Sequence, residues 1–448
     1  MTAFSLEPAQ LAWCAELRAL AAERLRPLAD KGEPGRVNRA LLAELGSLGL
    51  LGRLFTSGAL DLCLMRESLA YACTEAETAL ALQGLGAHPV HAHGTEAQRA
   101  RWLPGVADGS AVAAFALSEP GAGSDAAALG LRAELGGSPG VASGGGSPGA
   151  ASGGGSPDRS PGSAASGAGI RGAGARDGGS PGSGRAAHDS PHAIPDSPSP
   201  AELAATPDGP TRWRLTGEKC WISNAPEADF YTVFARTTPG AGARGVTAFL
   251  VPADRPGLTG AGLDMLSPHP IGALGFDAVP VTADDVLGEV DRGFRVAMGT
   301  LNLFRPSVGA FAVGMARAAL DATLAHTAGR DAFGGKLKDL QAVSHQVAEM
   351  ALRTEAARLM VYAAATAYDE DAPDVPQRAA MAKLLATETA QYVVDTAVQL
   401  HGARALQRGH LLEHLYREVR APRIYEGASE VQRGIIAKEL YAAHQEAR

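Results

Sequence analysis

The hydrophobic pattern changes twice along this chain of 448 residues, and these changes constrain its fold more than any other feature. Residues 6 to about 112 carry apolar side chains at helical spacing, and the same spacing returns after residue 291. Between them lie short β-rich runs broken by Gly, Pro and Asn, namely Trp213–Leu215, Phe230–Phe234 and Val246–Val251. The pattern predicts an α+β protein with a helical domain over 1–112, a β-domain over 113–290 and a helical domain over 291–448.

The segment from about 136 to 210 fits none of these patterns. Gly, Ser, Pro and Ala dominate it, and the unit Ala-Ser-Gly-Gly-Gly-Ser-Pro occurs at 142–148 and again at 151–157. Such a composition buries too little apolar surface to offset the entropy of ordering, so we expect disorder. The runs 129–134 and 213–216 on either side predict a hairpin with the insertion at its tip. A tethering role remains open, although a passive loop is favoured.

Composition excludes several classes of function. The net charge of −8 provides no basic surface for nucleic acid. The chain shows no secretory signal and no run of 18 apolar residues, so we expect no membrane insertion. Its four cysteines form no CxxC pattern, which favours reduced thiols and a cytoplasmic location.

The stretch Tyr425-Glu426-Gly427 is the strongest candidate for chemistry, because it places one carboxylate on a turn just before a helix. Ser429 and Gln432 have the spacing of a capping box at the start of that helix. A carboxylate held there and shielded from water becomes more basic, as a proton-abstracting residue requires. The alternative is an ordinary surface glutamate near a helix start.

Three further stretches are each ambiguous alone. Residues 116–125 run from a strand into a Gly-rich turn that suits either a phosphate group or a structural turn. Trp221 and Ser223 lie on one face of a predicted strand, where the ring either covers a planar cofactor or fills the core. Arg330, followed by Phe333 and Gln341, suits either a pyrophosphate or a solvated helix junction.

The histidines at 88, 91 and 93 lack partners at metal-ligand spacing, so we expect no metal.

In this order, the motifs resemble those of the acyl-CoA dehydrogenase family of flavoproteins. The resemblance runs through Leu117-Ser118-Glu119-Pro120-Gly121-Ala122-Gly123-Ser124-Asp125, Trp221-Ile222-Ser223-Asn224-Ala225, Arg330-Asp331-Ala332-Phe333-Gly334, Gln399-Leu400-His401-Gly402 and Ile424-Tyr425-Glu426-Gly427. It implies an N-terminal helical domain, a central β-barrel-like domain and a C-terminal four-helix bundle.

The resemblance also implies the cofactor and the residues that bind it. FAD would contact Phe115, Leu117, Ser118, Gly123, Ser124, Trp221, Ile222, Ser223, Ala428 and Glu430. Contacts to the FAD of a neighbouring subunit would come from Arg330, Phe333, Gln341, Gln399, Gly402 and Ala403. Glu426 would be the catalytic base, and Ser124, Arg305, Gly427 and Lys438 would lie near the acyl-CoA.

The implied reaction is α,β-dehydrogenation of an acyl-CoA, in which Glu426 takes the α-proton and flavin N5 takes the β-hydride. The implied partners are an electron-transfer flavoprotein as acceptor and further copies of the chain, in a homotetramer. Three alternatives remain open: a dehydrogenase acting on an acyl carrier protein thioester, an oxidase that passes electrons to oxygen, and a flavin-bound protein that binds a partner without turnover.

Overall fold

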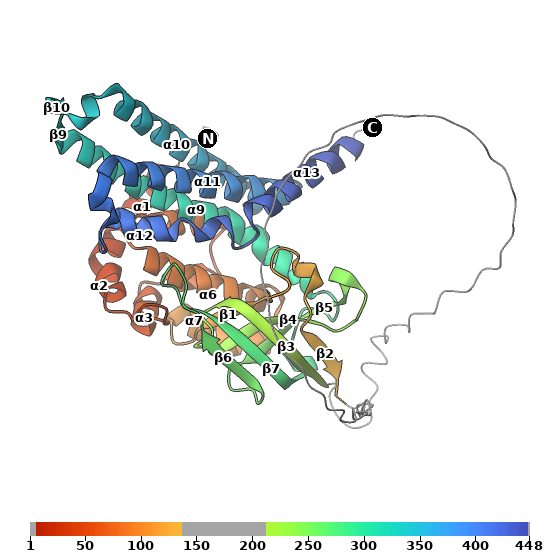
Figure 1. The fold of residues 1–448 in the computed structure, drawn as a ribbon. Coiled ribbons are helices and arrows are strands. Elements are labelled where there is room, and N and C mark those ends of the chain that lie inside the picture. The colour runs from red at the N-terminus through yellow and green to blue at the C-terminus, as the bar shows by residue number, and fades with distance from the viewer. Residues whose placement is uncertain (1–5, 137–211, 447–448) are drawn as a thin grey trace, which may run out of the picture.

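The computed structural model describes residues 6–136 and 212–446, and its elements follow the predicted order of helices, sheet and helices (Figure 1). The N-terminal helices pack around buried leucines such as Leu41, Leu45 and Leu69. Their bounds are α1 Pro8–Leu20, η1 Ala21–Leu25, α2 Arg26–Ala29, α3 Arg39–Ser47, α4 Leu50–Arg53, α5 Ala59–Ala72, α6 Thr74–His93 and α7 Glu96–Asp108.

Local signals explain where several of these helices begin and end. The side chain of Asn38 accepts a hydrogen bond from the Leu41 N–H and so caps α3. Thr95 and Gln98 form a capping box at the start of α7. That helix ends at Gly109, whose φ of 80° is a conformation that glycine adopts readily.

The central domain is one mixed sheet with the strand order β6-β7-β3-β2-β4-β5-β8, and β1 pairs with β4 in parallel. The central strands β4 and β5 are almost wholly buried, which explains their continuous apolar sequences. The strand bounds are β1 Ala113–Ala116, β2 Arg132–Leu135, β3 Arg212–Ser223, β4 Phe230–Arg236, β5 Val246–Pro252, β6 Leu258–Gly262, β7 Ile271–Thr282 and β8 Val286–Leu287.

Strands β2 and β3 confirm the predicted hairpin on either side of the insertion. They pair antiparallel from Arg132 with Thr216 to Leu135 with Trp213. Disorder is expected for residues from about 136 to 210, and because residues 137–211 lie outside the described residues, it stays a prediction.

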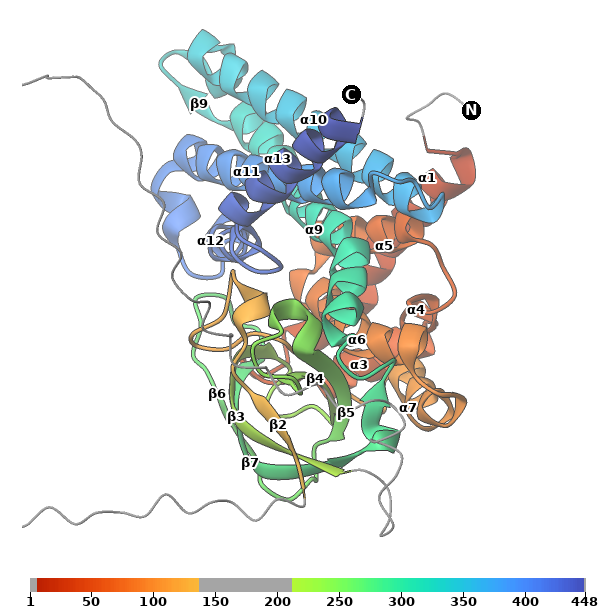
Figure 2. The same cartoon turned by 90° about the vertical axis from the view of Figure 1, so that its right-hand side faces the viewer.

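In the C-terminal domain, α9 packs against α10, α11 and the N-terminal helix α5, while α13 packs against α11 (Figure 2). By length and composition alone α9 would be able to cross a membrane, but 67% of its most apolar window is buried inside the protein. The bounds are α9 Gly293–Gly329, α10 Gln341–Asp369, α11 Val375–His401, α12 Leu411–Glu418 and α13 Ser429–Glu446. The short strands β9 Asp331–Ala332 and β10 Gly335–Lys336 form a hairpin between α9 and α10.

Candidate active site

The turn that carries Glu426 lies between the short helix η7 (Ala421–Arg423) and α13. Glu426 and Gly427 both have positive φ, 53° and 95°. This conformation is unfavourable for a glutamate, so the surroundings must hold it in place.

Donors from three helices bind the two carbonyl oxygens of this turn. Arg305 Nε of α9 donates to the Glu426 carbonyl at 3.2 Å, and Lys383 Nζ of α11 donates to the Gly427 carbonyl at 2.7 Å. Gln432 Nε2 of α13 donates to both, at 3.0 and 2.9 Å. We call Arg305, Lys383 and Gln432 the carbonyl clamp.

The capping box predicted for α13 is wrong. Ser429 is the first residue of the helix, and its hydroxyl donates to Glu388 Oε1 at 2.5 Å. Gln432 does reach back, but it donates to carbonyl groups, and its Oε1 is buried without a hydrogen-bond partner among the described residues. The reason is the left-handed turn, which presents two carbonyls to the Gln432 amide.

The Glu426 carboxylate is held without a full set of hydrogen bonds. Its Oε2 is buried and has no hydrogen-bond partner within the described part of the chain. Desolvation raises the pKa of Glu426, although Arg66, Arg305 and Lys383 act in the opposite direction. A carboxylate whose pKa is raised in this way is suited to accept a proton.

Behind the turn lies a buried ion pair that the sequence analysis did not identify. Arg66 Nε of α5 binds Glu77 Oε1 of α6, and Arg66 Nη1 donates to Ser307 Oγ at 2.7 Å. Arg66 and Glu77 are 3% and 0% exposed. Among the charges that lower the pKa of Glu426, Arg66 has the largest effect, so its guanidinium group opposes the effect of burial.

The Gly-rich turn after β1 is a tight structure with an open surface. Glu119 and Ala122 exchange backbone hydrogen bonds of 3.2 and 3.1 Å across it. A Cβ added to Gly121 or to Gly123 would meet no other atom of the described residues within 4 Å. The turn therefore leaves its glycine backbone accessible to a ligand.

A second buried ion pair fixes this turn to β3. Lys219 Nζ donates to Glu119 Oε1 at 2.8 Å and to the Leu117 carbonyl at 2.9 Å. The Glu119 carboxylate also accepts the N–H groups of Gly130 and Leu131, at 2.5 and 2.9 Å. Desolvation lowers the pKa of Lys219 to about 8, while Glu119 opposes the shift.

Trp221 follows Cys220, whose N–H donates to the Ser118 carbonyl just before this turn at 3.0 Å. Its side chain is 48% exposed, so it does not fill the core. Strand β3 is irregular here, with a register shift between Lys219 and Ile222, and Trp221 has a φ of 57°. Ile222 is buried, whereas Trp221 and Ser223 are not. The indole face is thus available to a planar ligand.

Models of three domains of one family match the chain. The N-terminal domain of acyl-CoA dehydrogenase matches residues 7–110, the middle domain residues 196–279 and the C-terminal domain residues 291–441. The chain belongs to the acyl-CoA dehydrogenase family.

Relatives and solved structures of this family cover nearly the whole chain. The mitochondrial short-chain specific acyl-CoA dehydrogenase of Bos taurus is 31% identical over 95% of this chain and 89% of its own length. The probable acyl-CoA dehydrogenase FadE25 of Mycobacterium tuberculosis is 29% identical over 95% of this chain and 93% of its own. The butyryl-CoA dehydrogenase structure from Megasphaera elsdenii superposes with a TM-score of 0.76 at 27% identity, covering 98% of this chain and 99% of that one.

These likenesses confirm the predicted fold class and the enzyme class. The chain is an FAD-dependent oxidoreductase of the acyl-CoA dehydrogenase family. The residues fit FAD: the open glycine turn suits a pyrophosphate, and the exposed Trp221 suits the face of a flavin ring. Phe115, Leu117 and Ser118 lie on or directly after β1, beside that turn.

The residues assigned to a neighbouring subunit's FAD gather elsewhere in this acyl-CoA dehydrogenase. They lie at the end of α9, in the β9–β10 hairpin and at the start of α10 that follow it, and at the end of α11, far from the sheet (Figures 1 and 2). The stacked rings of His326 and His401, 4.1 Å apart, join these two ends. We call the set the distal group; none of its members is buried, and they are Arg330, Phe333, Gln341, Gln399, Gly402 and Ala403.

The structure brings two of the four predicted substrate residues together. Arg305 and Gly427 meet at the Glu426 turn, with Arg305 only 5% exposed. Lys438 is exposed on α13, as is Ser124 in the glycine turn. Ala428 and Glu430 flank the start of α13, next to Glu426.

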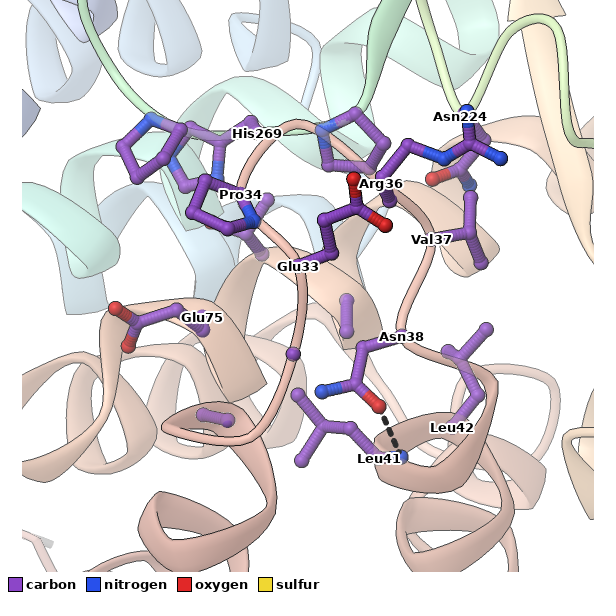
Figure 3. Close-up of a pocket in the computed structure, with 16 residues that line it drawn as sticks. Glu33, Pro34, Arg36, Val37, Asn38, Leu41, Leu42, Glu75, Asn224 and His269 are labelled. Carbon is purple, nitrogen blue, oxygen red and sulfur yellow. Dashed lines mark hydrogen bonds between the residues drawn. The ribbon is translucent and has the colours of Figure 1, made fainter.

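A hollow of about 120 Å³ is lined by other residues (Figure 3). The loop around Glu33 and Arg36, the start of α6 and the loop at His269 line it. Arg36 binds Glu227 and His269 binds Glu418, so its two positive groups already have partners. It contains none of the predicted flavin or substrate residues.

Proposed function

We propose that this protein catalyses the α,β-dehydrogenation of an acyl-CoA thioester, with Glu426 as the base that removes the α-proton. The observation that carries the proposal is the buried Oε2 of Glu426, which has no hydrogen-bond partner among the described residues, on a turn held in a left-handed conformation. A carboxylate kept in that state has no competing hydrogen bond at this oxygen, and desolvation has already raised its pKa.

In the proposed reaction, each residue of the site has its own role. Glu426 accepts the α-proton, and its backbone N–H polarises the thioester carbonyl, which makes the α-proton more acidic. The carbonyl clamp keeps the carboxylate in place while the proton moves. Substrate binding excludes water from the turn. Bound FAD would supply the redox chemistry, as the acceptor for the hydride from the β-carbon.

The proposal extends to partners and location. The accessible distal group favours a homo-oligomer, a tetramer, in which each subunit contributes these residues to a neighbouring FAD. An electron-transfer flavoprotein is the proposed acceptor. A structure described as that of the electron transferring flavoprotein of Acidaminococcus fermentans superposes at 26% identity with a TM-score of 0.76. We also propose a cytoplasmic location.

Anaerobic reduction of the bound flavin tests the function directly. Purified protein is mixed with butyryl-CoA, longer acyl-CoAs, branched acyl-CoAs and the same acyl groups on an acyl carrier protein. Bleaching of the flavin by at least one acyl-CoA is the expected result. Bleaching by carrier-bound substrates alone would favour the carrier-protein alternative, and no bleaching by any of them would favour a non-catalytic role.

A further inference from the structure

Lys383 is a buried cation whose ammonium group binds the turn that carries Glu426. Its side chain is 0% exposed on α11, near buried residues of the same helix such as Ala380 and Ala386. A charged amine in such a position is costly unless it is hydrogen-bonded. Its Nζ donates to the Gly427 carbonyl at 2.7 Å, a contact across 44 positions of sequence.

The geometry of the clamp gives Lys383 a distinct role. Gln432 belongs to α13, the helix that begins two residues after Gly427, whereas Lys383 comes from α11 in the C-terminal bundle. Arg305 holds the Glu426 carbonyl from α9, and Lys383 holds the next carbonyl along. The lysine therefore anchors the second residue of a two-residue left-handed turn to the helices behind it.

We propose that Lys383 is a positioning residue for Glu426, acting through the Gly427 carbonyl to hold the turn in the conformation that aims the carboxylate at the substrate. This inference rests on the proposed function of Glu426. Small errors in the placement of a reacting group are costly, since a displacement of about 1 Å can reduce a rate on the order of a hundredfold.

The charge of Lys383 depends on the groups around it. Desolvation lowers the pKa of Lys383 to about 8, and Arg305 of α9 acts in the same direction. Glu426, Glu388 of α11 and Glu430 of α13 raise it. As the pH rises through about 8, the ammonium loses its charge and its bond to Gly427 weakens. The rate of proton removal should fall over the same range.

The test is flavin reduction by the FAD-loaded protein under anaerobic conditions, with butyryl-CoA or the acyl-CoA that bleaches the wild type fastest. Lys383→Met should slow reduction on the order of tenfold to a hundredfold, with thioester affinity and FAD content changing far less. Lys383→Gln keeps an N–H donor without the charge and should recover part of the rate. Neither variant should show the fall in rate near pH 8 that the lysine gives the wild type.

Thr387→Val is the matched control. Thr387 is buried one turn further along α11, and its hydroxyl donates to the Lys383 backbone carbonyl without contacting the turn. It should reduce flavin at close to the wild-type rate. A crystal structure of Lys383→Met should show Glu426 outside the left-handed region.

Several results would overturn the inference. Wild-type reduction by Lys383→Met would do so, as would an unchanged Glu426 φ in its crystal structure. If Lys383→Met fails to fold, a wild-type rate and pH profile in Lys383→Gln would overturn it equally. Glu426→Gln distinguishes failure of the positioning role from failure of the proposed function. If Glu426→Gln does not reduce flavin while Lys383→Met reduces it normally, only the positioning role of Lys383 fails. If Glu426→Gln reduces flavin normally, the proposed function itself fails.

Discussion

The Glu426 turn and the distal group are both expected to serve the flavin site, yet the first is held by buried contacts and the second is exposed. The turn is held by donors from α9, α11 and α13, and one oxygen of its carboxylate is fully buried. In the distal group, Phe333 is 89% exposed with a φ of 55°. An aromatic side chain that is so exposed, on a residue with positive φ, receives little stabilisation from contacts within its own chain. The single chain thus fixes the Glu426 turn through its own buried contacts, whereas it leaves the distal group exposed, as the proposed oligomer requires.

The largest effect should come from Glu426 itself. Glu426→Gln should keep FAD and lose flavin reduction by a factor on the order of a hundred or more, because the variant lacks the general base. Anaerobic stopped-flow measurement with acyl-CoA checks this. Glu439→Gln, further along α13, is the control and should reduce flavin normally. Normal bleaching by Glu426→Gln would place the base elsewhere.

The same variant has a stability consequence. Because burial raises the pKa of Glu426, the folded state binds its proton more tightly than the unfolded state does. Stability from this group is present at low pH and is lost as the pH rises between the unfolded and folded pKa values. Because glutamine carries no charge, Glu426→Gln does not lose this stability as the pH rises. The variant should therefore unfold at a higher temperature than wild type at neutral pH. Equal unfolding temperatures would argue that the carboxylate is better solvated than its surroundings indicate.

The Arg66–Glu77 pair gives the next effect. Arg66→Met alone leaves Glu77 buried and unpaired, which should cost about 3–5 kcal/mol of stability, measured by denaturant unfolding. The double variant Arg66→Met with Glu77→Met should regain most of that loss. Arg66 lowers the pKa of Glu426, so the double variant should move the acid limb of kcat/KM to higher pH. An unmoved limb would show that Arg66 does not act on the base.

Much of the fold followed from hydrophobic spacing, and the hairpin beside the insertion was predicted from its flanking strands. The carbonyl clamp and the Arg66–Glu77 pair were missed, because they join residues far apart in sequence through buried side chains. A lysine among the apolar positions of α11 was the one available signal for Lys383. The capping box is wrong because it depends on the spacing of Ser429 and Gln432 alone. The left-handed conformation of the turn instead directs the Gln432 amide to the turn's carbonyl groups.

The distal group predicts a smaller, concentration-dependent effect. Phe333→Ser and Arg330→Ala should weaken FAD retention and shift the protein toward smaller species, while the Glu426 turn stays intact. Sizing chromatography with the ratio of flavin to protein measures both. Arg378→Ala, an exposed arginine at the other end of α11, should change neither. If the variants retain both FAD and assembly, the distal group has another role.

The smallest effect should come from deleting residues 138–208 and joining the strands with a short turn. Strands β2 and β3 already pair up to Leu135 and Trp213, so the sheet register does not depend on the removed segment. Shortening the loop should stabilise the fold by about one or two kcal/mol through a smaller closure entropy, measured by denaturant unfolding. Flavin reduction by substrate should remain unchanged.

If the insertion instead docks an electron acceptor or an acyl carrier protein, the deletion should raise the apparent KM for that partner while free acyl-CoA still bleaches the flavin. Assays of both proteins with substrate alone, and then coupled to an electron-transfer flavoprotein or an acyl carrier thioester, separate the two. A marked loss in a coupled assay alone would overturn the view of the insertion as a passive loop.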